Sequence, residues 1–188
     1  MPAVMQRLET RLAGPVLMEP VVHGDERGFF VETYRENVLA GFGISDRFVQ
    51  DNHSRSRRGV VRGLHFQPGM AKLLRCARGA IVDVLVDVRR GSPAFGQWEA
   101  YELSDANGRQ LYAPDGFAHG FCVTSEVADV VYKCSDYYDP TTEAGIAYDD
   151  PAIGIRWPDI ELTPSARDAD APALADLAGE LPFRYEGP

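Results

Sequence analysis

Hydrophobic and polar residues alternate along most of this chain with a period of two, the spacing of a β-strand that buries one face. The clearest case is residues 80–89, where every second residue from Val82 to Val88 is valine and Asp83 and Asp87 lie between them. Similar short runs occur at positions 29–35, 47–54, 59–66, 72–78, 98–104, 109–114, 119–125 and 129–138. The pattern therefore predicts a mainly β protein.

Turn signals separate these predicted strands. Clusters of glycine, proline and short polar residues fall at 23–28, 89–96, 104–109 and 113–116, and such clusters are typical of tight connections. Short helices are predicted at 36–41 and again after Ser165. No linker, repeat or low-complexity tract divides the chain, so we expect one domain over residues 1–188, folded as a β-sandwich or barrel.

Composition narrows the class of protein. Hydrophobic residues make up 45% of the 188 residues, which excludes a disordered chain. The net charge of −9 argues against a non-specific nucleic-acid binder. Three widely spaced cysteines indicate reduced thiols of a cytoplasmic protein. No segment has the apolar length of a signal peptide or a membrane span, so we expect a soluble protein that binds neither membrane nor nucleic acid.

Two glycine frames then appear in order. The first runs from Gly59 through His65 and Lys72 to Gly79, and the second runs from Gly108 to His119, in the form Gly-x5-Pro-x-Gly-x2-His. Both frames resemble the two motifs of cupin barrels, whose corners need glycine. The resemblance implies an all-β fold, a cupin-type double-stranded β-helix (a jelly-roll barrel) with a few short peripheral helices.

The metal ligands of those cupin motifs are mostly absent. Their four positions are occupied here by His65, Gln67, Lys72 and His119. Two imidazoles without a carboxylate rarely retain a metal, and the ammonium of Lys72 repels a cation. We therefore expect a pocket without a metal; a metal-dependent cupin oxygenase is the alternative.

Longer blocks identify a family. In order along the chain they read DERGFFVETYR, RFVQDNHSRS, GVVRGLHFQ, KLLRCARG, DVLVDVRRGSPAFGQW, PDGFAHGF and DVVYKCSDYY. From about Val16 to Pro172 the chain resembles the dTDP-4-dehydrorhamnose 3,5-epimerase family. The resemblance implies a homodimeric cupin without metal or cofactor that epimerises dTDP-4-keto-6-deoxyglucose at carbons 3 and 5.

Epimerisation beside a ketone needs a base on one face, an acid on the other and a cation or donor at the enolate oxygen. By resemblance His65 is the base and Asp168 its partner, and a histidine titrates near operating pH. Tyr132 matches the acid. Lys72 stands where the metal would be, and a preorganised charge of this kind lowers a barrier by ~3–4 kcal/mol.

The remaining family contacts concern the nucleotide. Arg27 and Arg62 match phosphate ligands, since guanidinium groups suit a pyrophosphate. Gln50 and Asn52 match polar contacts, and Tyr137 matches an aromatic residue beside the nucleotide. Phe30 and Glu32 resemble residues that an N-terminal strand contributes to the neighbouring subunit's site. We also expect His119 and Glu143 to line the pocket.

Each assignment has a simpler alternative. Ser165-x-x-Asp168 matches a helix capping box, Tyr132 and His65 fit ordinary barrel residues, Lys72 fits a solvated strand position, and Arg27 fits an ion pair with a neighbouring acid. At the level of function, the alternatives are an epimerase of a single carbon, a related ketoisomerase, and a non-catalytic module that binds nucleotide sugars.

Overall fold

Strands dominate the computed structural model, which describes residues 4–187. In chain order they are β1 Met5–Leu8, β2 Val16–Pro20, β3 Val22–Asp25, β4 Gly28–Val31, β5 Gln50–Arg57, β6 Val61–Phe66, β7 Lys72–Arg78, β8 Ala80–Asp87, β9 Trp98–Ser104, β10 Gln110–Ala113, β11 Phe117–Val123, β12 Val127–Cys134 and β13 Ala144–Gly145. The short helices are α1 Glu36–Gly41, α2 Ala166–Ala169 and α3 Leu174–Leu177. The predicted all-β class is confirmed.

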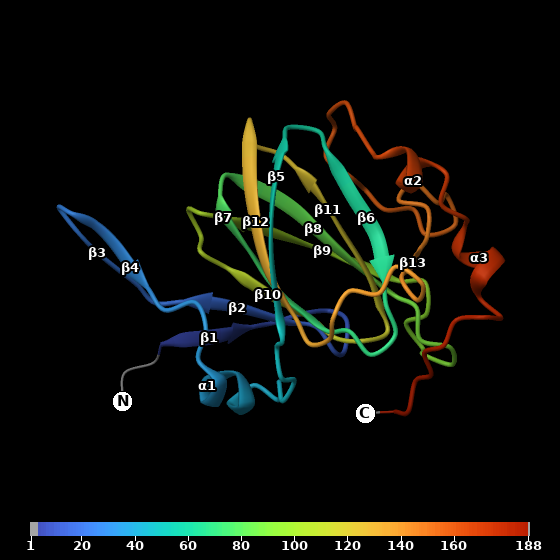
Figure 1. Ribbon diagram of the computed structural model, residues 1–188, viewed down its shortest axis with the longest axis horizontal. Helices are drawn as coiled ribbons and strands as arrows, with labels where there is room; N and C mark the ends of the chain where they lie inside the picture. Colours follow the sequence, from blue (N-terminus) through green and yellow to red (C-terminus); the bar gives the residue numbers. More distant parts are fainter. Residues whose placement is uncertain (1–3, 188) are drawn as a thin grey trace.

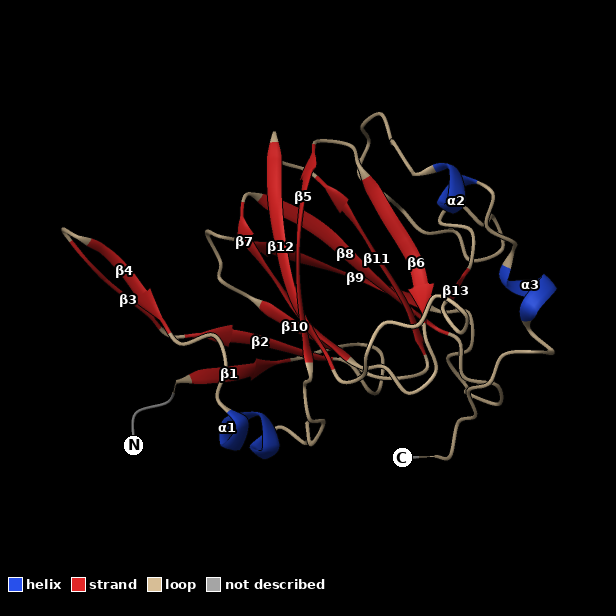
Figure 2. Cartoon of the chain, in the orientation of Figure 1, coloured by secondary structure: helices blue, strands red, loops and turns tan. Residues whose placement is uncertain are grey.

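Two antiparallel sheets face each other and enclose the core (Figures 1 and 2). One sheet has the order β1-β2-β10-β7-β12-β5 and the other β13-β6-β11-β8-β9. Leu74 and Leu111 of the first sheet pack with Leu85 and Phe121 of the second in one buried cluster. This is the jelly-roll arrangement that the glycine frames predicted.

The alternation in β8 places its two faces in different environments. Val84, Val86 and Val88 lie on the outer face, where the C-terminal segment covers them with residues such as Leu181 and Phe183. Leu85 points into the space between the sheets. Asp83, two residues from Leu85 on the same strand, is fully buried, so this interior face carries a carboxylate.

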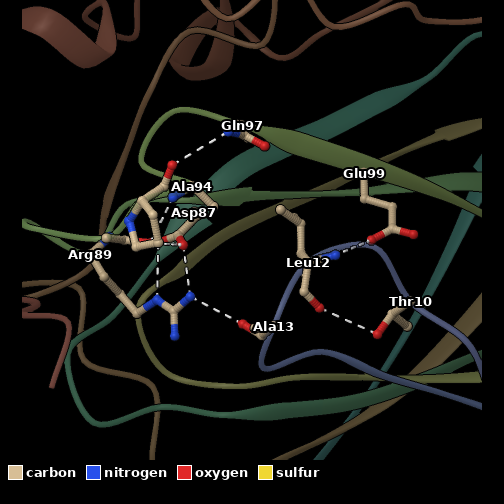
Figure 3. A network of polar contacts seen from close by, with 10 residues as sticks. Thr10, Leu12, Ala13, Asp87, Arg89, Ala94, Gln97 and Glu99 are labelled. Carbon is tan, nitrogen blue, oxygen red and sulfur yellow. Dashed lines mark hydrogen bonds and ion pairs between the residues drawn. The ribbon is translucent and has the colours of Figure 1, made fainter. Parts of the chain in front are cut away.

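The segment between β1 and β2 packs Leu12 into the core between the sheets. Glu99 accepts hydrogen bonds from the main-chain N–H groups of Arg11 and Leu12, at 2.9 and 2.8 Å. Arg89 donates to the carbonyl of Ala13 at 3.1 Å and pairs with the buried Asp87 at 2.7 Å (Figure 3). These bonds fix the segment over one part of the core.

The glycines of the predicted frames lie in turns that exclude other residues. Gly59 and Gly79 have φ angles of 82° and 77°. A Cβ atom on Gly59 would lie 2.3 Å from the carbonyl oxygen of Glu161, and one on Gly79 would lie 2.2 Å from that of Val127. Both the φ angle and the close approach therefore require glycine.

Several predicted boundaries were wrong. β4 ends at Val31 rather than continuing to 35, and the helix expected after Ser165 is divided into α2 and α3. In addition, β1 and β2 were not predicted, because they had no clear pattern in the sequence. Part of the turn predicted at 23–28 is paired as β3 and β4. The single domain over residues 1–188 stays a prediction. Among residues 4–187, no helix is long and apolar enough to cross a membrane.

The β3–β4 hairpin extends away from both sheets (Figure 1). Its large apolar side chains are open to solvent, with Phe29 72% and Phe30 69% exposed. Within residues 4–187 the hairpin forms its own two-stranded sheet. Exposed aromatic residues on a projecting hairpin are typical of a surface that another chain covers.

Candidate active site

A histidine–carboxylate pair, in which Asp168 is buried and His65 is partly buried, is the centre of the site. His65 lies on β6, and Asp168 lies in α2, more than 100 residues later. The Nε2 atom of His65 is 2.6 Å from Oδ1 of Asp168. A carboxylate at this distance accepts a hydrogen bond from Nε2–H, which leaves the lone pair on Nδ1 free to act as a base.

Asp168 also takes part in the predicted helix cap. Its main-chain N–H donates to Oγ of Ser165 at 3.1 Å, while its Oδ2 atom accepts from the N–H of Gly63 at 3.4 Å. A complete capping box would return the side chain to the N–H of Ser165. Here the main chain of Asp168 is capped and its carboxylate faces His65, so both interpretations of Ser-x-x-Asp hold in part.

Burial governs the protonation of His65. Desolvation lowers the pKa of His65, and the hydrogen bond and charge of Asp168 oppose this effect without cancelling it. A lowered pKa keeps the imidazole neutral at neutral pH. The ring is thus in the form that can accept a proton.

Lys72 and Tyr132 reach the same cavity from the opposite sheet. Lys72 begins β7, and Tyr132 lies on the adjoining strand β12. Burial lowers the pKa of Lys72, whereas Cys134, Glu143 and Asp83 act in the other direction. Burial also raises the pKa of Tyr132, which keeps its phenol protonated.

The cavity consists of two adjoining hollows of about 520 and 290 Å³ that share Lys72, Tyr132 and Glu143. Four more of the predicted residues line the larger hollow: Arg62, His65, His119 and Asp168. Gln50 and Asn52 line the smaller one. The structure thus brings nine of the thirteen predicted site residues together.

The other four predicted residues lie outside these hollows. Arg27 and Phe30 are on the projecting hairpin, where Arg27 forms an ion pair with Asp25. Glu32 follows the hairpin and pairs with Arg35. Tyr137 is 67% exposed, and its carbonyl accepts a hydrogen bond from Nε2 of Gln67 at 2.9 Å.

Polar contacts hold the cavity walls in place. Nε2 of Gln50 donates to Oδ1 of Asn52 at 3.2 Å, and Nε of Arg62 donates to Oγ of Ser56 at 3.0 Å. His119 faces His65 across the β6–β11 pairing, and its Nε2 lies 2.9 Å from Oδ2 of Asp83. The lining therefore presents fixed donors and acceptors.

Sequence analysis missed three residues of this region. Arg167 lines the larger hollow and pairs with Glu143 at 2.7 Å. Tyr138 lines the smaller hollow. Asp83 lies behind His119. A basic residue directly before Asp168 and an acid within a run of valines were the available signals for Arg167 and Asp83, whereas Tyr138 had none that distinguished it from Tyr137.

The described residues contain no cluster of three or more histidine, cysteine, aspartate or glutamate side chains placed to hold a metal ion. At the four cupin ligand positions, His65 and His119 each face a carboxylate, and Gln67 is hydrogen-bonded to the main chain of Tyr137 and Asp139.

Comparison with known proteins establishes the family. Residues 9–176 match the family model described as dTDP-4-dehydrorhamnose 3,5-epimerase. The enzyme of that name from Salmonella typhimurium is 49% identical over 172 residues, which cover 89% of this chain and 94% of that protein. A dTDP-4-dehydrorhamnose 3-epimerase from Streptomyces niveus is 44% identical over 169 residues, covering 87% and 82%.

A solved structure agrees in fold. The dTDP-6-deoxy-D-glucose-3,5-epimerase of Legionella pneumophila, in complex with dTDP-4-keto-L-rhamnose, superposes with a TM-score of 0.94 at 46% identity, covering 97% of this chain and all of that one. The predicted resemblance is thereby confirmed, and the chain belongs to the dTDP-4-dehydrorhamnose 3,5-epimerase family.

Proposed function

We propose that this protein epimerises dTDP-4-keto-6-deoxyglucose at carbons 3 and 5. The observation that carries the proposal is the His65–Asp168 pair, which shares one cavity with Lys72 and Tyr132. Family membership and the sugar nucleotide bound to the Legionella relative support the substrate. A binding module alone needs no such combination of base, cation and phenol.

The two facing sheets supply groups for the two faces of a sugar. His65 belongs to the sheet that contains β6, and Tyr132 belongs to the sheet that contains β12. In the proposed reaction Nδ1 of His65 removes the proton beside the ketone, and the electrons of the broken C–H bond form an enolate. The phenol of Tyr132 then donates a proton to the same carbon from the opposite side.

Lys72 stabilises the charge that develops on the keto oxygen. Its side chain lines the larger hollow together with the proposed base and acid, and a preorganised cation in a water-poor site interacts strongly with an enolate. The same arrangement serves both carbons beside the ketone, because each gives an enolate with its charge on the same oxygen.

The other polar residues hold the nucleotide. Arg62 supplies a guanidinium to the larger hollow, while Gln50 and Asn52 supply amides to the smaller one. His119 and Glu143 complete the polar lining. The proposed role of Tyr137 is to stack beside the nucleotide at the exposed rim, next to Tyr138.

The hairpin residues act in a homodimer. Three predicted site residues lie apart from the cavity of their own subunit: Arg27, Phe30 and Glu32. The aromatic side chains of the hairpin are exposed to solvent in the single subunit, and we expect the partner subunit to bury them. We therefore place Arg27 on the phosphates and Phe30 and Glu32 beside the nucleotide of the partner subunit's site.

Three buried, unpaired cysteines agree with a cytoplasmic location.

A subunit-complementation experiment tests this composite site. One subunit carries Arg27→Ala with Phe30→Ala and the other carries His65→Ala, and each variant alone is expected to be inactive. The co-expressed heterodimer, purified through two different tags, contains one site without a defect, so it should recover about half of the wild-type activity.

A heterodimer of His65→Ala and Asp168→Asn is the control. Both of these changes lie on the same side of the interface, so each of its sites keeps one defect and activity should stay low. If the hairpin heterodimer recovers nothing while it remains dimeric by light scattering, the hairpin does not serve the partner's site.

The activity itself is tested by incubating the purified protein with dTDP-4-keto-6-deoxyglucose. We expect ¹H NMR coupling constants to show inverted configuration at carbons 3 and 5. Inversion at one carbon supports the single-carbon epimerase, transfer of the keto group supports a ketoisomerase, and binding without conversion supports the non-catalytic module.

A further inference from the structure

Asp83 is a buried carboxylate with one oxygen that accepts no hydrogen bond from the described residues. Its side chain is 0% exposed, and Oδ2 lies 2.9 Å from Nε2 of His119. Oδ1 has no hydrogen-bond partner among residues 4–187. A buried charged oxygen without a partner is rare in native proteins and calls for a functional or electrostatic explanation.

Lys72 carries a positive charge that also lacks a partner among the described residues. Within the described part of the chain its ammonium takes part in no hydrogen bond or ion pair, although the residue is largely enclosed. The titratable groups that line the two hollows with Lys72 come from both sheets and from the segments beside them: Arg62, His65, His119, Tyr132, Cys134, Tyr138, Glu143, Arg167 and Asp168. Asp83 of β8 lies behind His119, outside this lining.

Three carboxylates lie in or directly behind this cavity, Asp83, Glu143 and Asp168, and Asp168 already faces His65 at 2.6 Å. Glu143 is already paired with the guanidinium of Arg167 at 2.7 Å. Asp83 shares one oxygen with the imidazole of His119 and leaves the other unbound. Of these carboxylates, Asp83 is thus the one with a buried oxygen that has no hydrogen-bond partner among residues 4–187.

The burial of the two groups makes each depend on the other. Desolvation raises the pKa of Asp83 and lowers the pKa of Lys72, so each group alone is driven towards its neutral form. His119 and, after it, the charge of Lys72 oppose the first effect, and Cys134, Glu143 and then Asp83 oppose the second. Opposite charges that share a buried site can both persist.

We propose that Asp83 is the counter-charge that keeps the Lys72 ammonium in place in the cavity, and that it is therefore a positioning residue for the reaction. The proposal rests on the proposed role of Lys72 at the enolate oxygen. Asp83 itself lies behind His119 and acts through Lys72. Its hydrogen bond to His119 fixes the carboxylate so that Oδ1 remains available.

Lysine NMR gives a direct test, because the chain contains two lysines, Lys72 and Lys133. Labelling the protein with ¹³Cε-lysine yields one signal for each, and Lys72→Met assigns them. Lys133 pairs with Asp51 at the surface and serves as an internal reference. In the wild-type protein we expect the Lys72 signal to be that of an ammonium at pH 7.

Asp83→Asn should lower the pH at which the Lys72 signal titrates by at least about one pH unit, because removing the negative charge removes what favours the ammonium. The Lys133 signal should not move. In the same variant kcat should fall about 10- to 100-fold while the Kd of dTDP stays within about twofold, since the effect acts on transition-state charge.

Asp87→Asn is the matched control. Asp87 is equally buried on the same strand, but it pairs with Arg89 outside the cavity. Its loss should lower the melting temperature and leave the Lys72 titration unchanged. Asp83→Ser, whose hydroxyl can still accept from His119, takes the place of Asp83→Asn if the amide variant does not fold.

Two results would overturn the inference: a neutral Lys72 amine at pH 7 in the wild type, or a Lys72 titration that does not move when Asp83 is replaced. The second result would leave Asp83 as a support for His119 alone. Wild-type protein without epimerase activity would instead contradict the proposed function, and the NMR titration would still decide whether Asp83 and Lys72 are coupled.

Discussion

His65→Ala is expected to abolish exchange of the substrate's protons with solvent at both carbons while dTDP still binds. The imidazole is the proposed base for each proton abstraction. Among residues 4–187, the other histidine that lines the cavity and faces a carboxylate is His119, whose partner Asp83 is fully buried. Exchange is measured by ¹H NMR in deuterated water, and dTDP binding by calorimetry.

Asp168→Asn should lose about 10²–10⁴ in rate, because an amide cannot stabilise the imidazolium that forms and does not enforce the same tautomer. Asp170→Asn is the control, since Asp170 is an exposed acid two residues further along the same segment. Full activity of Asp168→Asn would mean that Asp168 serves the helix cap alone.

Tyr132→Phe should separate proton removal from proton return. The substitution keeps the ring and its packing and removes the phenolic proton. With His65 and Lys72 intact the enolate still forms, but re-protonation occurs from the side that the proton left. In deuterated water we expect label to enter the sugar with strongly reduced inversion of configuration.

Two further tyrosines serve as a control and as a test of the alternative acid in this experiment. Tyr112→Phe removes a buried hydroxyl that bonds to Asp46 at 2.6 Å on the outer side of the sheet, so it should affect melting and not inversion. Inversion at the wild-type rate in Tyr132→Phe would assign the acid elsewhere, and adding Tyr137→Phe would test the nearest alternative. Loss of exchange together with inversion would also remove Tyr132 from the role of acid.

The strand pattern was readable from the sequence where one face of a strand is buried. β8 is the best example, because its valines and its Asp83–Leu85 face alternate without interruption. β1 and β2 were not recognised. β2 pairs with β10, which is distant in the chain, and β1 in turn pairs with β2 at the edge of the sheet. Local alternation cannot report such a partner.

The site was predictable as far as the family blocks extended. His65, Lys72 and Tyr132 lie on strands with clear patterns, and the structure places them around one cavity. Asp168 reaches His65 through the path of the C-terminal segment, which no local pattern specifies. The same limit applies to Arg167 with Glu143 and to Asp83 with His119, because these contacts arise from tertiary packing.

Lys72 lines both hollows, so the smaller hollow adjoins the proposed reaction site. Met70, Gln67 and Tyr138 line that hollow together with Lys72. Both a 3,5-epimerase and a 3-epimerase are more than 40% identical to this chain. The residues proposed for proton transfer are compatible with either outcome, so the number of carbons inverted has to be read from the product.

The central claim is that one cavity removes a proton beside the ketone and returns another to the opposite face. Incubation of the wild-type protein with dTDP-4-keto-6-deoxyglucose in deuterated water tests it, with the product followed by ¹H and ²H NMR. We expect one deuteron at carbon 3 and one at carbon 5, each with inverted configuration. Unlabelled substrate recovered with both configurations unchanged, from folded protein that binds dTDP, would contradict it.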